Sequence, residues 1–205
     1  MKVIAYGKIV KMKTKLVNPK RIVDFMILAG KLKWLKRTGW INAKMPDPET
    51  VAEHTFRVTI LSRILAPLLG LDVEKLTIMA IFHDFAEGIF GDPILESGRR
   101  KVREYSWKDE SKFMEKVFKD LNMPNLYLEW KENILENGPQ QTIYSDSLYQ
   151  IGKLANAWQA FEYELRGVPK EKTNEFWENS LEHIKIPVLR KILNSLIQLR
   201  GSGKI

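Results

Sequence analysis

The stretch IMAIFHDFAEGIFGDP (residues 78–93) places a histidine and an aspartate side by side within an apolar part of the chain. Neighbouring residues on a helix point about 100° apart, so His83 and Asp84 can both face one ligand that lies between their directions. Glu87 follows one turn later on the same face, and Asp92 comes just after the expected helix end. Polar groups among apolar residues need a metal ion or a hydrogen-bond network to satisfy them. Taken alone, a His-Asp pair is more often structural, so the rest of the sequence must decide.

Working outward from this stretch, apolar residues at helical spacing predict an all-α chain. Asp72 is a good N-cap for the helix that contains the stretch, and we expect this helix to end near Phe90. Proline and glycine residues separate the other predicted segments. Helices are predicted over residues 19 to about 38, 49–69 with Pro67 disturbing the last turn, from within 96–112 to about 121, 125–136, 141–166, 173–183 and 187–199.

The first 17 residues, MKVIAYGKIVKMKTKLV, are compatible with a short strand, a hairpin or an extended arm, and periodicity does not choose among them. We therefore expect a basic N-terminal arm over residues 1–18 and a single helical-bundle domain over residues 19–205. Residues 1–37 carry a net charge of +10, whereas the whole chain carries +8. Such an arm could attract phosphate-bearing ligands, nucleic acid or an acidic partner, or be a solvated basic surface. No nucleic-acid-binding motif accompanies it.

Composition narrows the class of protein. A chain of 205 residues with 44% hydrophobic residues suits one domain with a sizeable core. No apolar stretch approaches the roughly 20 residues that span a bilayer, so we expect a cytoplasmic protein without membrane contact. The chain has no cysteine. A metal would therefore have to be held by nitrogen and oxygen ligands.

A second histidine lies in PETVAEHTFRV (residues 48–58), where His54 stands near the start of the preceding predicted helix. This segment, HDFAEGIFGDP, LKWLKRTGW (residues 32–40) and QAFEYE (residues 159–164) together resemble the HD-domain metal-dependent phosphohydrolases. The resemblance is to the 5′-deoxynucleotidase-like branch, which includes bacterial deoxyribonucleoside 5′-monophosphatases and eukaryotic HD-domain-containing proteins. It extends over about residues 25–165. The order and spacing of these short motifs make it specific.

The resemblance implies a divalent metal held by His54, His83 and Asp84. Manganese, cobalt or another first-row transition metal is expected, with magnesium as an alternative, because nitrogen and oxygen ligands accept several divalent ions. The metal would polarise a phosphoryl oxygen and supply a water-derived nucleophile.

The resemblance also assigns roles around that metal. Glu87 and Asp92 would activate or orient the water and assist the leaving group. Arg37 would bind the substrate phosphate through its planar fork, the alternative being a helix-end arginine that bonds the last carbonyls. Trp40 would lie in or beside the pocket, the alternative being an ordinary core tryptophan.

One position departs from the family pattern. The family places a fourth ligand, an aspartate, eight residues before the alanine of the QAFEYE motif, and this chain has Gly152 there. Ala155 replaces the acidic residue that normally follows. Asp146 lies about 120° off the required direction on a regular helix, so it serves only if the helix is irregular; otherwise water or substrate fills the position.

The leading hypothesis is therefore an enzyme that removes phosphate from (deoxy)nucleoside 5′-monophosphates. The first alternative is a catalytically weakened paralogue that acts as a nucleotide-binding or regulatory module, with the basic arm binding nucleic acid or a partner. A second is another HD-domain activity, such as cyclic-nucleotide or pyrophosphate hydrolysis. Family members are often dimers, and apolar faces of the C-terminal helices could form a homodimer.

Overall fold

The computed structural model describes residues 2–5, 8–11, 18–92, 95–96, 99–100, 107–133 and 142–202. The chain is α-helical over most of these residues. The helices are α1 (Pro19–Lys31), α2 (Thr38–Asn42), α3 (Val51–Leu65), α4 (Val73–Phe82), α5 (Glu87–Phe90), α6 (Trp107–Asp120), α7 (Pro124–Asn133), α8 (Ile143–Leu165), α9 (Asn174–His183) and α10 (Pro187–Ser202), with 3₁₀ turns η1 (Ala66–Leu69) and η2 (Lys170–Lys172). This confirms the predicted all-α class.

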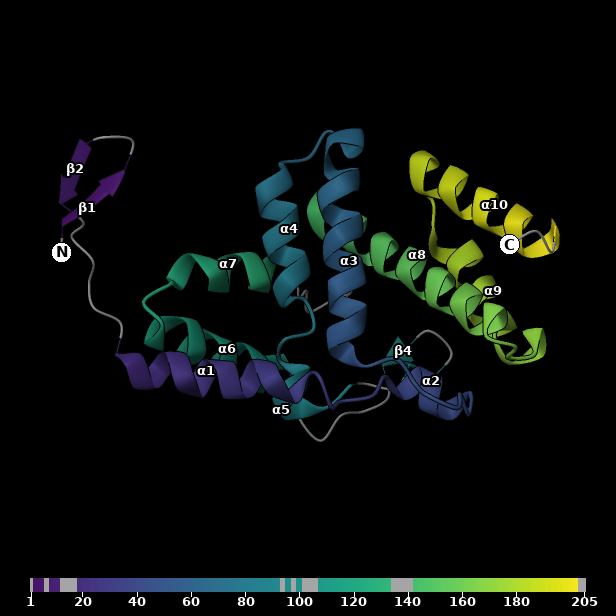
Figure 1. Cartoon of the computed structure of the whole chain (residues 1–205), viewed down its shortest axis with the longest axis horizontal. Coiled ribbons are helices and arrows are strands. Elements are labelled where there is room, and N and C mark those ends of the chain that lie inside the picture. The colour runs from purple at the N-terminus through teal and green to yellow at the C-terminus, as the bar shows by residue number, and fades with distance from the viewer. Residues whose placement is uncertain are drawn as a thin grey trace.

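The helices α3 and α4 lie side by side in the middle of the molecule (Figure 1). On one side of them are α1, α6 and α7, and on the other are α8, α9 and α10. The long helix α8 contacts α3 directly, while α7 contacts α4. The two central helices therefore link two separately packed halves.

Local signals explain where the central helices begin and end. Thr50 accepts a hydrogen bond from the backbone N–H of Glu53, and the Glu53 carboxylate accepts one from that of Thr50, forming a capping box at the start of α3. Pro67 stands in the 3₁₀ turn that ends this helical segment, as predicted. Gly70 follows with φ of 68°, a left-handed conformation that glycine adopts without strain. Asp72 caps α4 through its bond from the Lys75 N–H.

Two predicted helix ends were wrong. The first helix stops at Lys31 rather than near residue 38, because the segment after it turns and Lys36 forms a β-bridge with Thr50. Helix α4 stops at Phe82, whereas the helix predicted after Asp72 was expected to end near residue 90. There the backbone N–H groups of Phe85 and Glu87 bond carbonyls three residues back, which tightens the chain into turns.

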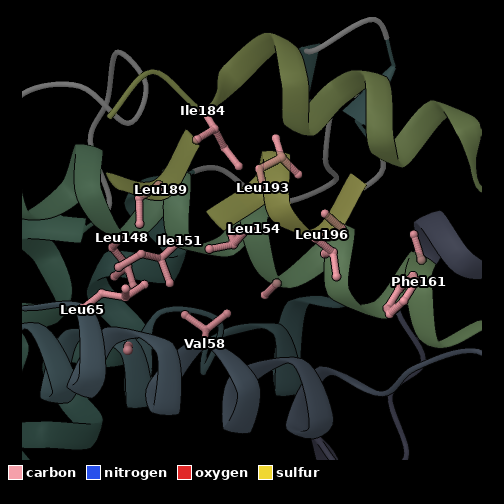
Figure 2. Close-up of a cluster of buried hydrophobic side chains, with 14 of the residues drawn as sticks. Val58, Leu65, Leu148, Ile151, Leu154, Phe161, Ile184, Leu189, Leu193 and Leu196 are labelled. Atoms are coloured by element: carbon pink, nitrogen blue, oxygen red, sulfur yellow. The ribbon is translucent and has the colours of Figure 1, made fainter. Parts of the chain in front are cut away.

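The apolar side chains form two buried clusters. The larger one joins α3, α4, α8, α9 and α10 and includes Val58, Leu65, Ile151 and Leu193 (Figure 2). The smaller one joins α1, the α4–α5 segment, α6 and α7; it includes Leu28, Val51, Phe85, Phe118 and Trp130. His54 lies between Val51 and Val58 in sequence, and Asp84 immediately precedes Phe85. Both polar residues thus come from chain segments that pass from one cluster to the other.

Among the residues that the structure describes, the named strands form two short antiparallel ribbons. The strands β1 (Lys2–Ala5) and β2 (Lys8–Lys11) pair antiparallel with Val3 opposite Val10, so the hairpin is the N-terminal alternative observed. The strands β3 (Leu95–Glu96) and β4 (Arg99–Arg100) also pair antiparallel. None of the helices in the described part of the chain has the length and apolar character needed to cross a bilayer. The boundary predicted between arm and domain at residue 18 stays a prediction.

Candidate functional site

A short bridge between two loops brings the first site residues together. The Arg37 N–H donates to the Glu49 carbonyl at 2.8 Å, and the Val51 N–H donates to the Leu35 carbonyl at 2.8 Å. This pairing holds the segment after α1 against the start of α3. It brings Arg37 within electrostatic range of His54, although 17 residues separate them in sequence.

His54, His83 and Asp84 form a compact donor group. One nitrogen or oxygen atom from each lies within 4.8 Å of the others. The Oδ2 atom of Asp84 is 3.1 Å from Nε2 of His83 and 3.9 Å from Nε2 of His54. Ligand atoms about 2.1 Å from one first-row metal ion lie roughly 3.0 to 3.4 Å apart, so this group is close to the size of a metal site.

The hydrogen bonding of His83 tests whether a cation fits this group. Its Nδ1 lies 2.7 Å from the Ala80 carbonyl oxygen, and a carbonyl can only accept, so Nδ1 carries the proton. In the neutral ring, Nε2 is then a lone pair that faces the Asp84 carboxylate, another acceptor. This buried Nε2 has no hydrogen-bond partner among the described residues. A metal ion between the two acceptors would satisfy both, and the donor set therefore fits one.

The charges of these groups suit the same arrangement. Burial and the neighbouring Arg37 lower the pKa of His54 well below its ordinary value, so its imidazole is neutral, the form that binds metals. Burial alone would raise the pKa of Asp84, but the charge that His83 carries when its ring is protonated and the charge of Arg37 outweigh burial and lower that pKa strongly. Asp84 is therefore ionised.

Arg37 lies between two carboxylates. Its Nη1 donates to Oδ2 of Asp84 at 3.1 Å, and its Nε is 3.6 Å from Oδ1 of Asp92. Burial opposes the guanidinium charge, but Asp92 and Asp84 raise its pKa overall. The Asp92 carboxylate also accepts from the Thr38 N–H at 2.5 Å, and its carbonyl accepts from the Thr38 hydroxyl at 2.8 Å. The start of α2 thus holds Asp92 beside Arg37.

Glu87 is a buried carboxyl group beside the donor group, with 7% of the residue exposed. Burial raises its pKa well above the ordinary value, and the charges of Asp84 and Asp92 and a hydrogen bond to Asp92 raise it further. Its Oε2 has no hydrogen-bond partner among the described residues. A protonated carboxyl group next to a carboxylate is a combination that can hold and release a proton.

Trp40 is buried beside Glu49. Only 1% of it is exposed, its ring stacks on Phe176 with centroids 3.7 Å apart, and its Nε1 donates to Oε2 of Glu49 at 3.0 Å. The predicted contact of Trp40 with substrate stays a prediction. The sequence predicts for Glu49 only a place at the start of a helix, yet its buried carboxyl group lies 3.8 Å from Nδ1 of His54. Its place five residues before His54 in PETVAEHTFRV was the signal available.

The QAFEYE motif fastens α8 to this region. Arg57 donates from Nη1 and Nη2 to the Glu162 carboxylate, both at 2.8 Å, and from Nη2 to Gln159 at 2.9 Å. The Tyr163 hydroxyl accepts from the Glu49 N–H at 2.7 Å and donates to the Asp47 carbonyl at 3.0 Å. The motif therefore anchors the loop that carries Glu49.

The position where the family pattern has an aspartate is open. A Cβ atom added to Gly152 would meet no described atom within 4 Å. The adjacent Lys153 has its pKa lowered to about 8 by burial and by the charge of Arg37, which places this part of α8 within electrostatic range of the site. Asp146 accepts from Nε2 of Gln150 at 2.9 Å and is not in the 4.8 Å donor group. The alternative in which Asp146 replaces the missing ligand has no support in the structure.

The sequence matches the HD domain family over residues 29–187. Among curated proteins, it is 31% identical to "5′-deoxynucleotidase hdd1" of Schizosaccharomyces pombe, over 87% of this chain and 90% of that protein. It is 28% identical to "5′-deoxynucleotidase HDDC2" of Danio rerio, over 84% of this chain and 86% of that protein.

Solved structures agree with these matches. A protein from Pyrococcus horikoshii OT3 superposes with a TM-score of 0.64 and 31% identity, over 86% of this chain and 99% of the other. A conserved hypothetical protein from Pyrococcus furiosus gives a TM-score of 0.65 and 32% identity over the same shares. The resemblance inferred from the four motifs is confirmed, and the chain belongs to the HD-domain family, in its 5′-deoxynucleotidase-like branch.

Proposed function

We propose that the protein is a metal-dependent phosphohydrolase that removes phosphate from nucleoside 5′-monophosphates, with a preference for deoxynucleotides. The observation that carries this is the close grouping of His54, His83 and Asp84 beside Arg37 and Glu87. The curated relatives named 5′-deoxynucleotidases support the substrate class. They do not favour the alternative of a catalytically weakened regulatory module.

His54, His83 and Asp84 would hold a divalent ion. Two imidazoles and one carboxylate favour manganese, cobalt or another first-row ion, and magnesium is the alternative that metal analysis would separate. When bound, such an ion supplies Lewis-acid polarisation of a phosphoryl oxygen and an activated water. Because the family's aspartate position is Gly152, which has no side chain to coordinate, the fourth position would be left for water or substrate.

The remaining residues position the phosphate and move protons. Arg37 presents a guanidinium held by Asp84 and Asp92, where its fork can take two oxygens of the phosphate. Glu87, kept protonated by burial, can pass its proton to the leaving 5′-oxygen. Asp92, which the backbone N–H of Thr38 holds in place beside Glu87, would accept the proton that the attacking water loses.

The experiment measures phosphate release from a panel of deoxynucleoside and nucleoside 5′-monophosphates with Mn²⁺ or Co²⁺. His83→Ala should abolish turnover, and chelation should abolish it reversibly. The matched control is His183→Ala: His183 also places Nδ1 against a backbone carbonyl, at 2.8 Å from Asn179, but lies outside the donor group. No turnover across all nucleotides and metals, or equal loss in both variants, would contradict the proposal. Turnover of cyclic nucleotides or pyrophosphates instead would identify the other HD-domain activity.

The homodimer, the cytoplasmic location and nucleic-acid binding by the basic arm stay predictions. The sequence suggests apolar faces of the C-terminal helices as the dimer surface. On α10, however, Leu189 and Leu193 are buried within the chain, so this face does not serve for a dimer. The stripe of Phe56, Ile60 and Ile64 on α3 is exposed and better suited. Light scattering of the wild type and Ile60→Glu would test it; a monomeric wild type would refute the dimer.

A further inference from the structure

Glu49 is a carboxyl group enclosed on all sides, and burial raises its pKa to about 7. Its side chain is 1% exposed. Its backbone is fixed at both ends, since its N–H donates to the Tyr163 hydroxyl at 2.7 Å and its carbonyl accepts from the Arg37 N–H at 2.8 Å. Trp40 Nε1 donates to Oε2 at 3.0 Å. Burying a polar group so deeply costs folding free energy unless the group is hydrogen-bonded, so its position needs an explanation.

Three buried atoms around this carboxylate lack hydrogen-bond partners among the described residues: Glu49 Oε1, His54 Nδ1 and Arg57 Nε. They face one another. His54 Nδ1 is 3.8 Å from Oε2 of Glu49, and Arg57 Nε is 3.9 Å from Oε1. Both distances exceed a normal N–H···O bond by about 0.8 Å, a gap that small side-chain rotations close. The Glu49 carboxyl group can therefore accept from Arg57 Nε and, in the tautomer that carries the proton on Nδ1, from His54.

We propose that Glu49 is a positioning residue that accepts a hydrogen bond from Nδ1–H of His54 and thereby points the Nε2 lone pair of His54 toward Asp84. The inference rests on the proposed metal site, which it deepens. A neutral imidazole has one N–H and one lone pair, and the partner of one nitrogen decides which atom remains for a metal. With Nδ1 protonated, the free lone pair is on Nε2, the nitrogen 3.9 Å from Oδ2 of Asp84.

His83 shows the same arrangement with a different partner. Its Nδ1 is held by the Ala80 carbonyl at 2.7 Å, so its Nε2 also faces Asp84. Glu49 would do for His54 what a backbone carbonyl does for His83. Among the described residues no backbone carbonyl bonds Nδ1 of His54, so a side chain would have to supply that acceptor.

The first test needs neither metal nor a variant of Glu49. Long-range ¹H–¹⁵N correlation spectra of the metal-free protein report which ring nitrogen carries the proton. The chain has three histidines, so His83→Ala and His183→Ala assign the signals. We expect the Nδ1–H form for His54. The Nε2–H form would overturn the proposal.

The second test measures binding of Mn²⁺ alone by calorimetry. Glu49→Gln keeps the volume but places an amide N–H₂ against the surrounding donors, and we expect a 10- to 100-fold weaker Kd and a mixed His54 tautomer. Activity lost at low Mn²⁺ should return with excess Mn²⁺, with KM for the nucleotide unchanged. The control is Glu162→Gln, which alters the other carboxylate on Arg57 without facing His54; its Kd should stay within about twofold.

The outcomes separate this inference from the proposed function. Unchanged Mn²⁺ affinity and tautomer in Glu49→Gln, or equal weakening in Glu162→Gln, would overturn the role of Glu49 while leaving the function intact. A wild type that binds no divalent metal would contradict the proposed function. In that case the tautomer of His54 still decides whether Glu49 positions the ring.

Discussion

Replacing Lys153 by methionine should stabilise the protein at neutral pH. Lys153 lies on α8 with 7% of the residue exposed, and its Nζ donates to Oδ1 of Asn179 at 2.7 Å. Burial and the charge of Arg37 lower its pKa from 10.5 to about 8. The folded state therefore holds the lysine proton less tightly than the unfolded chain does.

The magnitude follows from that pKa difference. A shift of about 2.5 pKa units at about 1.36 kcal/mol each corresponds to roughly 3.4 kcal/mol of destabilisation while the lysine is protonated in both states. Methionine removes this cost but leaves the Asn179 oxygen without its donor, which costs about 1 to 3 kcal/mol. We expect a net gain of about 1 to 2 kcal/mol in the free energy of unfolding at pH 7.

The pH dependence identifies the cause. Between pH 8 and 10.5 the unfolded chain binds the lysine proton and the folded protein does not, so the contribution of this site makes the wild type more stable as pH rises. The advantage of Lys153→Met should therefore shrink by about 2 kcal/mol between pH 7 and 9.5.

Urea unfolding of both proteins at the two pH values measures this directly. Lys191→Met, on the exposed side of α10, is the control and should change stability by less than about 0.5 kcal/mol at either pH. A variant that is less stable than the wild type at pH 7, or a difference that does not vary with pH, would refute the reasoning.

Four further substitutions at three positions test other contacts. Gly152→Ala should stabilise α8 by about 0.5 to 1 kcal/mol in thermal unfolding, because its Cβ would meet no described atom within 4 Å. Gly152→Asp should bind Mn²⁺ at least about tenfold more tightly than Gly152→Ala. Equal Mn²⁺ affinity in the two variants would show that this position does not face the metal. Gly88→Ala should destabilise by about 1 to 3 kcal/mol, since its Cβ would lie 3.1 Å from Leu28 Cδ1 and 3.3 Å from the Leu28 carbonyl; an unchanged melting temperature would argue against this close contact. Thr50→Ala should lose about 1 kcal/mol in urea unfolding through its cap to Glu53, and no loss would mean that the capping box contributes little.

Much of the candidate site could be located from sequence because its markers are local. His83 and Asp84 are adjacent, Glu87 is one turn on, and Asp92 follows the glycine that ends α5. Arg37 was assigned through the LKWLKRTGW resemblance, and the structure places it 3.1 Å from Asp84. The structure places these residues near one another, and their metal-binding and catalytic roles stay predictions.

The sequence places Glu49 five residues before His54, but it does not reveal that the two side chains meet. Its environment is made by Trp40 from one helix and by Tyr163, which is 114 residues away in sequence. No pattern within a few turns reports such contacts. The same holds for Lys153, whose burial comes from packing of α8 against α9 through Asn179.

By itself, the sequence determined that the chain is helical, where most helices begin, and which residues could hold a metal. Caps such as Asp72 and breaks such as Pro67 act within a single turn of backbone, so they can be read residue by residue. The tertiary structure decided where α4 ends, that Asp146 bonds Gln150 instead of entering the site, and that Glu49 faces His54. These outcomes depend on how helices distant in sequence pack together. Charges and hydrogen bonds interact strongly only after that packing has excluded water.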